Sequence, residues 1–524
     1  MTIQAEASAT QSPAPPDREA DRTTSTVVTA ANVRGSVMML AGQVAAMGVS
    51  FASQLLVVRH LTKAEYGAFA WALSGVLLLQ SVIALGLDRA DTRFMAHFDE
   101  RRQYGRLRGL LVIEASTVVL FGLGVLGAAF ALRGPIQDGV APSGTATTLL
   151  LILLALAPLQ ALDILVVNVF AVFATPKSVF FRRYVLEPGL RLLVVVALVV
   201  TDGSARYLAA GYLLAGAVGL GTYLVLLVRL LDRTGLAGRF ASAARELPVR
   251  QVFAFSLPML LTNLVAVATT ELAAVVLGRY RGAAEVAAFR AVQPFAALNL
   301  VVLFSFMTLF TPVAARAIAR DDIGTLRDLY WRTCGWITVV TAPVFILTTV
   351  FARPVVVTAL GPEYASSWPY LATLSLGYFV NAALGFNGLV VQMLGRVRYV
   401  LATNVAVLVF MAAADFLLIP AFGAGGAAIA VLTTLLVHNL WKQGGLIGGV
   451  GAWDGGHART AVGVAVAVGV LGAIEAIAHP PLVVALALCG LAGVTLLRTN
   501  RLRLRVADTF PEATRVRVLA RVLQ

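Results

Sequence analysis

Residues 147–172 read TTLLLILLALAPLQALDILVVNVFAV, an apolar run that contains Gln160, Asp163 and Asn168 as its only strongly polar side chains. An α-helix needs about 20 mostly apolar residues to cross about 30 Å of hydrocarbon. Similar runs recur along the 524 residues, of which 59% are hydrophobic and 13% charged, with a mean hydropathy of +0.84. Because a soluble domain has roughly 25% charged residues, this composition excludes an ordinary cytosolic enzyme and indicates a polytopic membrane protein.

A window of that length predicts an all-α membrane protein with about fourteen transmembrane helices. The predicted spans are residues 36–57, 66–87, 109–131, 147–172, 185–200, 208–228, 252–278, 286–312, 333–352, 368–392, 399–419, 425–446, 460–478 and 481–497.

The basic residues support this count. If the N-terminus is cytoplasmic, 32 of the 41 Lys and Arg residues fall in cytoplasmic tails and loops, seven fall outside, and Arg191 and Arg290 fall within spans. This asymmetry follows the positive-inside rule. The formal net charge of +14 is therefore a topology signal, and we expect no nucleic-acid partner. The basic C-terminal tail is expected to contact anionic membrane lipids.

The spans divide into two halves of six. We predict a disordered cytoplasmic tail at 1–34, six-helix bundles at 35–232 and 252–447, a cytoplasmic linker at 233–251, helices 13 and 14 within 448–497, and a basic cytoplasmic tail at 498–524. EYGAF at 65–69 and EVAAF at 285–289 are related by an offset of 220. An even number of spans in each half, together with this offset, favours parallel structural repeats.

Motifs for bond-making chemistry are missing from the sequence. It contains no HExxH, Walker A, GxSxG or paired CxxC motif, and the GxGxxG at 122–127 lies inside a predicted helix and follows no strand. The two cysteines, Cys334 and Cys489, lie in or beside apolar segments and are expected to be small buried side chains. We therefore expect neither an enzyme nor a metal centre.

Six stretches resemble a known family in their order and spacing. They are RHLTKAEYGAFAWAL (59–73), GLDRADTRF (86–94), RRYVLEPGLRLLVV (182–195), LGPEYASSWPYL (360–371), MLGRVRYVLATN (393–404) and DFLLIPAFGAGGAAIA (415–430). Together they resemble the polysaccharide flippases of the multidrug/oligosaccharidyl-lipid/polysaccharide exporter superfamily. The resemblance implies two six-helix bundles that rock around a central cavity, with both termini cytoplasmic.

The same resemblance implies a function. Its expected cargo is a polyprenyl-diphosphate-linked oligosaccharide that crosses the bacterial cytoplasmic membrane for polysaccharide biosynthesis. Expected partners are this lipid-linked substrate, membrane lipids, and a polysaccharide polymerase with other assembly proteins. A cation-coupled multidrug exporter of the same superfamily is an alternative, and it predicts an acidic, aromatic-lined cavity. A membrane-embedded glycan polymerase or ligase is a second alternative, although it would need a larger outer loop than the sequence predicts.

Arginine side chains suit a diphosphate because they are always charged and donate hydrogen bonds in a planar fork. Arg290, within span 286–312, is the first candidate, unless it extends to the outer surface. Arg89 and Arg93, at the cytoplasmic end of the second span, either receive the headgroup or only anchor the topology. Arg191 lies four residues after Glu187, a spacing that predicts either an ion pair or a substrate contact.

Acidic residues inside spans are candidates for energy coupling. Glu114, Asp163 and Glu271 are hypothesised to bind a coupling H⁺ or Na⁺, the only cofactor we expect. The alternative for each is a buried hydrogen bond or an ion pair with an interior arginine.

Overall fold

The computed structural model describes residues 42–173, 180–500 and 504, except for the side chains of Arg89 and Thr92. Within these ranges the chain is helical and contains no β-strand, as predicted. Eleven of the described helices are long and apolar enough to cross a membrane. The predicted N-terminal tail and almost all of the predicted C-terminal tail lie outside the described residues.

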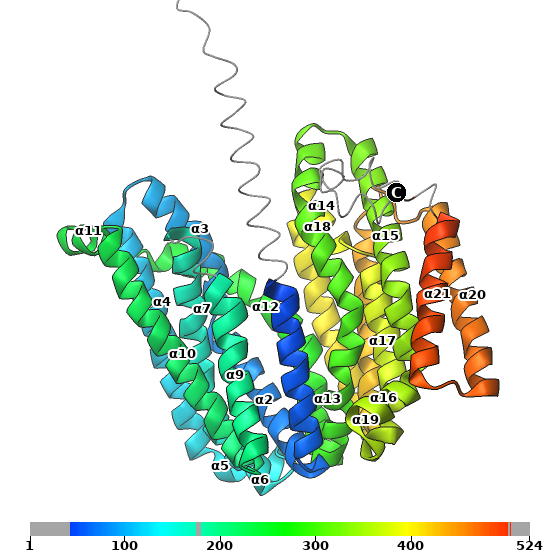
Figure 1. Cartoon of the computed structure of the whole chain (residues 1–524). Coiled ribbons are helices and arrows are strands. Elements are labelled where there is room, and N and C mark those ends of the chain that lie inside the picture. The colour runs from blue at the N-terminus through cyan, green and yellow to red at the C-terminus, as the bar shows by residue number, and fades with distance from the viewer. Residues whose placement is uncertain (1–41, 174–179, 501–503, 505–524) are drawn as a thin grey trace, which may run out of the picture.

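Two lobes of helices make up most of the molecule (Figure 1). The N-terminal lobe begins with helical residues 42–60. Its further elements are α2 (Lys63–Ile83), α3 (Leu87–Glu100), α4 (Tyr104–Ala131), α5 (Arg133–Gly139), α6 (Gly144–Leu154), α7 (Leu156–Phe173), the π-helix η1 (Phe181–Leu186), α9 (Glu187–Val200), α10 (Ala205–Arg233) and α11 (Leu236–Ser242).

The C-terminal lobe comes next in the chain. Its elements are α12 (Val249–Arg281), α13 (Ala283–Ala297), the 3₁₀-helix η2 (Leu298–Leu300), α14 (Val301–Ala319), α15 (Ile323–Thr349), α16 (Ala352–Leu360), the 3₁₀-helix η3 (Pro362–Ser367), α17 (Trp368–Ala383), α18 (Asn387–Met393) and α19 (Val397–Gly444). The last two helices, α20 (Gly455–Ala478) and α21 (Leu482–Asn500), pack against α15 at the side of this lobe.

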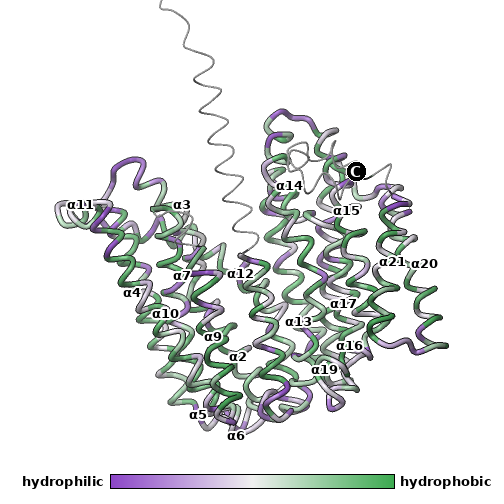
Figure 2. Tube along the Cα trace, in the orientation of Figure 1, coloured by the Kyte–Doolittle hydropathy of each residue, from purple (hydrophilic) through white to green (hydrophobic). Residues whose placement is uncertain are grey.

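The lobes meet at one end and diverge at the other (Figure 1). We call these the narrow end, where α5 and α6 lie, and the wide end, where α11 lies. Figure 2 shows hydrophobic helices between hydrophilic ends, as a membrane-spanning protein requires. The connections at 101–103, 234–248, 320–322 and 394–396 lie at the wide end, and each contains arginine.

Backbone contact between α2 and α13 closes the narrow end. These helices begin at Lys63 and Ala283, which differ by the offset of 220 found in the sequence. A Cβ atom added at Gly67 would lie 1.8 Å from the carbonyl oxygen of Ala283, a distance at which real atoms overlap. Glycine at position 67 therefore lets the two repeat-related helices touch.

Basic side chains join the lobes at this end as well. The guanidinium of Arg59 donates to the carbonyl oxygens of Thr358 and Ala359, at 2.5 and 2.7 Å, in the last turn of α16. Lys63 Nζ donates to the carbonyl oxygen of Glu363 at 3.1 Å. Each cation faces carbonyl groups with partial negative charge, so both contacts stabilise closure.

The predicted spans need several corrections, and span 368–392 is one of them, because a turn that includes Gly385, at φ +62°, separates α17 from α18. Span 66–87 ends earlier, at Ile83, and a turn at Gly86 starts the separate helix α3, because Gly86 adopts φ +69°. Span 185–200 begins too late, because the chain is already helical at 180 and continues through η1. Spans 399–419 and 425–446 form the single assigned helix α19, which breaks at Gly423, where φ is 58° and ψ is −136°. The count of fourteen itself stays a prediction.

Candidate functional site

A cavity of about 650 Å³ lies between the two lobes. Helical residues 42–60 and the segment of η1 and α9 line it from the N-terminal lobe, and residues of α13, η2 and α14 line it from the other. Its strongly polar lining residues are Gln43, Gln54, Arg183, Tyr184, Glu187 and Arg191. We call this space the central cavity.

A smaller pocket of about 170 Å³ continues from the central cavity. The two spaces share Ser50, Gln54, Pro188 and Arg191 as lining residues. The smaller one extends along helical residues 42–60 to Val57 and is also lined by Tyr66, Tyr212 and Arg290. We call it the inner pocket.

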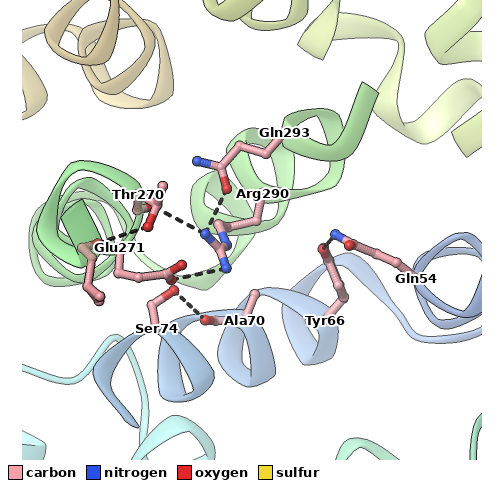
Figure 3. Close-up of polar contacts among 9 residues, drawn as sticks. Gln54, Tyr66, Ala70, Ser74, Thr270, Glu271, Arg290 and Gln293 are labelled. Atoms are coloured by element: carbon pink, nitrogen blue, oxygen red, sulfur yellow. Dashed lines mark hydrogen bonds and ion pairs between the residues drawn. The ribbon is translucent and has the colours of Figure 1, made fainter. Parts of the chain in front are cut away.

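Arg290 reaches the inner pocket from α13 (Figure 3). One of its terminal nitrogens lies 3.1 Å from Oε2 of Glu271 on α12, and the two side chains are 14% and 9% exposed. The other terminal nitrogen donates to Gln293 Oε1 at 2.7 Å and to the carbonyl oxygen of Thr270 at 3.3 Å. Arg290 therefore does not extend to the outer surface, and the ion pair predicted as the alternative for Glu271 is present.

A small residue of α2 lines the inner pocket together with Arg290. Ala70 of α2 occupies the position related to Arg290 by the offset of 220, and both residues line the inner pocket. A neighbouring hydrogen bond joins Gln54 Nε2 to the hydroxyl of Tyr66 at 3.1 Å (Figure 3). The small alanine on one helix leaves room for the long charged side chain on the other.

Arg191 forms the ion pair that was one of the two predictions for it. It donates to Glu187 Oε1 at 2.9 Å, one helical turn away, as the spacing predicts. The two side chains are 43% and 40% exposed, and both residues line the central cavity. The ion pair and a contact with cargo are thus compatible.

Arg183 adds a second cation to the central cavity, beside Arg191, and is not among the predicted site residues. The sequence placed it with Arg182 in a cytoplasmic loop, whereas both lie in η1. The guanidinium of Arg183 lies 6.0 Å from the ring centre of Tyr184. The signal was the run RRYVLEPGLRLL, in which three arginines precede or enter a span.

Arg182 pairs with Asp163 inside the N-terminal lobe. A terminal nitrogen of Arg182 donates to Asp163 Oδ1, and the side chains are 5% and 17% exposed. The same guanidinium lies 5.1 Å from the ring centre of Tyr223. Asp163 therefore has the interior arginine partner that we named as its alternative role, although that arginine was assigned to a loop.

Removing one partner of this pair should be costly. Asp163→Leu leaves a charged, buried guanidinium without its carboxylate, and we expect a loss of about 3–5 kcal/mol in the free energy of unfolding. Asp163→Leu combined with Arg182→Leu should recover most of that loss, because both charges are gone. Thermal unfolding in lipid nanodiscs tests this. A double variant no more stable than Asp163→Leu alone would contradict it.

Arg93 and Glu114 lie apart from the central cavity. Arg93 of α3 is exposed, and its guanidinium stacks 4.7 Å from the ring centre of Phe255 on α12. The backbone of Arg89 belongs to the same helix, but its side chain lies outside the described part of the structure. Glu114 of α4 is buried and lines a separate small cavity with Asp91. The seven predicted residues therefore do not form one site.

Comparison with known proteins identifies the family. A family model described as "Polysaccharide biosynthesis protein" matches residues 32–317, more than half of the chain. The chain belongs to this family. A second model, MatE, matches residues 258–417. The family is thus part of the multidrug/oligosaccharidyl-lipid/polysaccharide exporter superfamily, as the sequence motifs suggested, and the chain is a multi-pass membrane transporter of that superfamily.

Solved structures share the fold of this family member. The lipid II flippase MurJ in an inward closed conformation matches with a TM-score of 0.68 and 11% identity, over 89% of this chain and 99% of that one. An inward-facing multidrug resistance MATE family transporter matches with a TM-score of 0.60 and 16% identity, over 75% of this chain and 93% of that one. The MATE multidrug transporter DinF-BH matches with a TM-score of 0.53 and 14% identity, over 80% of this chain and 96% of that one. No curated protein matches the sequence.

Proposed function

We propose that this protein is a flippase that moves a polyprenyl-diphosphate-linked oligosaccharide across the bacterial cytoplasmic membrane for polysaccharide biosynthesis. The observation that carries this proposal is the set of three arginines, Arg183, Arg191 and Arg290, along the central cavity and inner pocket. Guanidinium groups bind phosphate oxygens through paired, charge-assisted hydrogen bonds. The lipid tail would stay in the membrane while the charged headgroup enters between the lobes.

The orientation follows from the basic loops. By the positive-inside rule the arginine-rich wide end would face the cytoplasm, and both termini would lie on that side. The lobes are apart at the wide end and closed at the narrow end (Figure 1). In that orientation the arrangement would be the inward-facing state of an alternating-access cycle, able to accept cargo from the cytoplasmic leaflet.

Electrostatics favour an anionic cargo over a cationic drug. Glu187, which lines the central cavity, pairs with Arg191, and Glu271 pairs with Arg290 beside the inner pocket. Arg183 stacks beside Tyr184, and no carboxylate within the described residues pairs with it. The lining therefore carries an excess of positive charge, whereas a cation exporter needs unpaired carboxylates there.

Deletion of the gene tests the proposal against its main alternative. In the organism that carries the gene, we expect the deletion to stop one surface polysaccharide and to trap its lipid-linked precursor in the cytoplasmic leaflet. The wild-type gene should restore both. Unchanged polysaccharide and precursor levels together with increased sensitivity to cationic drugs would favour the multidrug exporter instead.

A further inference from the structure

Two buried carboxyl groups face each other inside the N-terminal lobe, away from the central cavity. Asp91 of α3 and Glu114 of α4 are 2% and 1% exposed. They interact directly, and both line a small pocket of about 20 Å³. That space is about the size of one water molecule and too small for a hydrated ion.

Few hydrogen-bond donors reach the carboxyl oxygens of this pair. Asn168 of α7 donates to Asp91 Oδ2 at 3.2 Å. Within the described residues, nothing donates to Asp91 Oδ1 or to either oxygen of Glu114. Two adjacent carboxylates in an apolar interior cannot both stay ionised, so such a pair holds a proton.

Among the described residues that line this space, none is a cation. The other residues that line the space are Asp88 of α3 and apolar side chains of α3, α4, α7 and Ala84. Asp163 is the charged residue of α7, and it forms an ion pair with Arg182. On α12, which packs against α3, Ser256 is the buried polar residue near Gly86, and it carries no charge. Arg89 of α3 has a side chain outside the described part of the chain.

Helix α3 connects this pair to the contact between the lobes. Asp91 on α3 lies against α4, whereas Phe94 and Arg93 of the same helix contact Phe255 of α12 in the C-terminal lobe. The N-cap of α3 is Gly86, where an added Cβ would lie 2.4 Å from the carbonyl oxygen of Ser256. A change in how α3 packs on α4 therefore changes the contacts between α3 and α12.

We propose that Asp91 and Glu114 share one coupling proton, which is bound in the state described here. Its release makes the two carboxylates repel, changes how α3 packs on α4, and shifts the lobes through α12. This inference rests on the proposed flippase function, because a coupling proton drives an alternating-access cycle only in a transporter. The bound species is assigned as a proton because two adjacent carboxyl groups in an apolar interior hold one, and the experiment below separates it from Na⁺.

Infrared spectroscopy of the full-length protein in lipid nanodiscs tests the shared proton without any cargo. We expect a protonated-carboxyl band at neutral pH that disappears in alkali, and its loss in both Asp91→Asn and Glu114→Gln. Both substitutions preserve size and remove a charge, so the fold should persist. If one variant fails to fold, the other decides. The matched control is Asp322→Asn at the exposed N-cap of α15, which should keep the band. Hydrogen bonds from the backbone and hydroxyl of Thr325 lower the pKa of Asp322, so it is ionised.

A second readout on the same samples follows the lobes. Spin labels at the exposed positions Glu100 and Arg320, one at the wide end of each lobe, should report a distance that changes with pH in the wild type and in Asp322→Asn. That pH dependence should be lost in Asp91→Asn and Glu114→Gln. A wild type without the carboxyl band, a band unchanged in both variants, or a distance that responds to Na⁺ and not to pH would overturn the proposal.

The two proposals fail in different ways. If the band and the distance change are present but lipid-linked glycan is not flipped, the shared proton stands and the flippase function is wrong. If glycan is flipped but the wild type lacks the band, the flippase function stands and the proton site is wrong.

Discussion

Arg290→Ala is expected to lower the rate of glycolipid flipping by roughly 10- to 100-fold at unchanged protein levels. A hydrogen bond to a charged partner contributes about 1.5–3 kcal/mol, and the variant removes such a contact from the inner pocket. Arg290→Lys should recover only part of the rate, because one ammonium cannot replace a fork that reaches Glu271, Gln293 and the Thr270 carbonyl together. Flipping is measured in proteoliposomes with a fluorescent polyprenyl-diphosphate glycan.

The same substitution leaves Glu271 buried without its partner, so a control must separate folding from function. Arg290→Gln combined with Glu271→Gln removes both charges, and we expect it to unfold at nearly the wild-type temperature yet to flip poorly. Arg206→Ala, an exposed arginine outside both cavities, should flip normally. A double variant with normal flipping would show that Arg290 only neutralises Glu271 and does not bind cargo.

Gly67→Leu should have the second large effect, on the closed narrow end. Its side chain would occupy the space of the Ala283 carbonyl, which belongs to the backbone and cannot move aside alone. Overpacking of a well-packed core costs about 1–3 kcal/mol, and separating α2 from α13 costs at least that much. We expect a lower unfolding temperature and weaker contact between Lys63 and Glu363 across the lobes.

Gly124→Leu is the matched control for this prediction. An added Cβ at Gly124, on α4, meets nothing within 4 Å, so this variant should unfold at the wild-type temperature. Cysteines at positions 63 and 363 should cross-link in Gly124→Leu and in the parent, and much less in Gly67→Leu. Equal stability and equal cross-linking in the two leucine variants would contradict the role given to Gly67.

The sequence predicts the parts of this site that depend on local spacing. The apolar runs define the helices because burial in lipid requires them. The Glu187–Arg191 pair follows from a separation of four residues on one helix. The offset of 220 between EYGAF and EVAAF correctly relates the starts of α2 and α13.

The rest depends on packing between helices. Arg290 and Glu271 lie on different helices, so neither composition nor period indicates that they meet. Arg182 was assigned to a loop because its charge moved the predicted start of the span to residue 185. Asp163, a carboxylate inside an apolar run, was a signal that a nearby arginine had to be interior. The contact of Glu114 with Asp91 was missed because Asp91 was assigned to a loop rather than to α3.

A binding measurement tests whether the space between the lobes binds a diphosphate through its arginines. The full-length protein in nanodiscs is titrated with a polyprenyl-diphosphate disaccharide and with the same glycolipid carrying a neutral linkage. We expect the diphosphate form to bind roughly 10- to 100-fold more tightly. We expect this preference to disappear when Arg183, Arg191 and Arg290 are all replaced by glutamine. Equal binding of the two glycolipids by the wild type, or an unchanged preference in the triple variant, would contradict it.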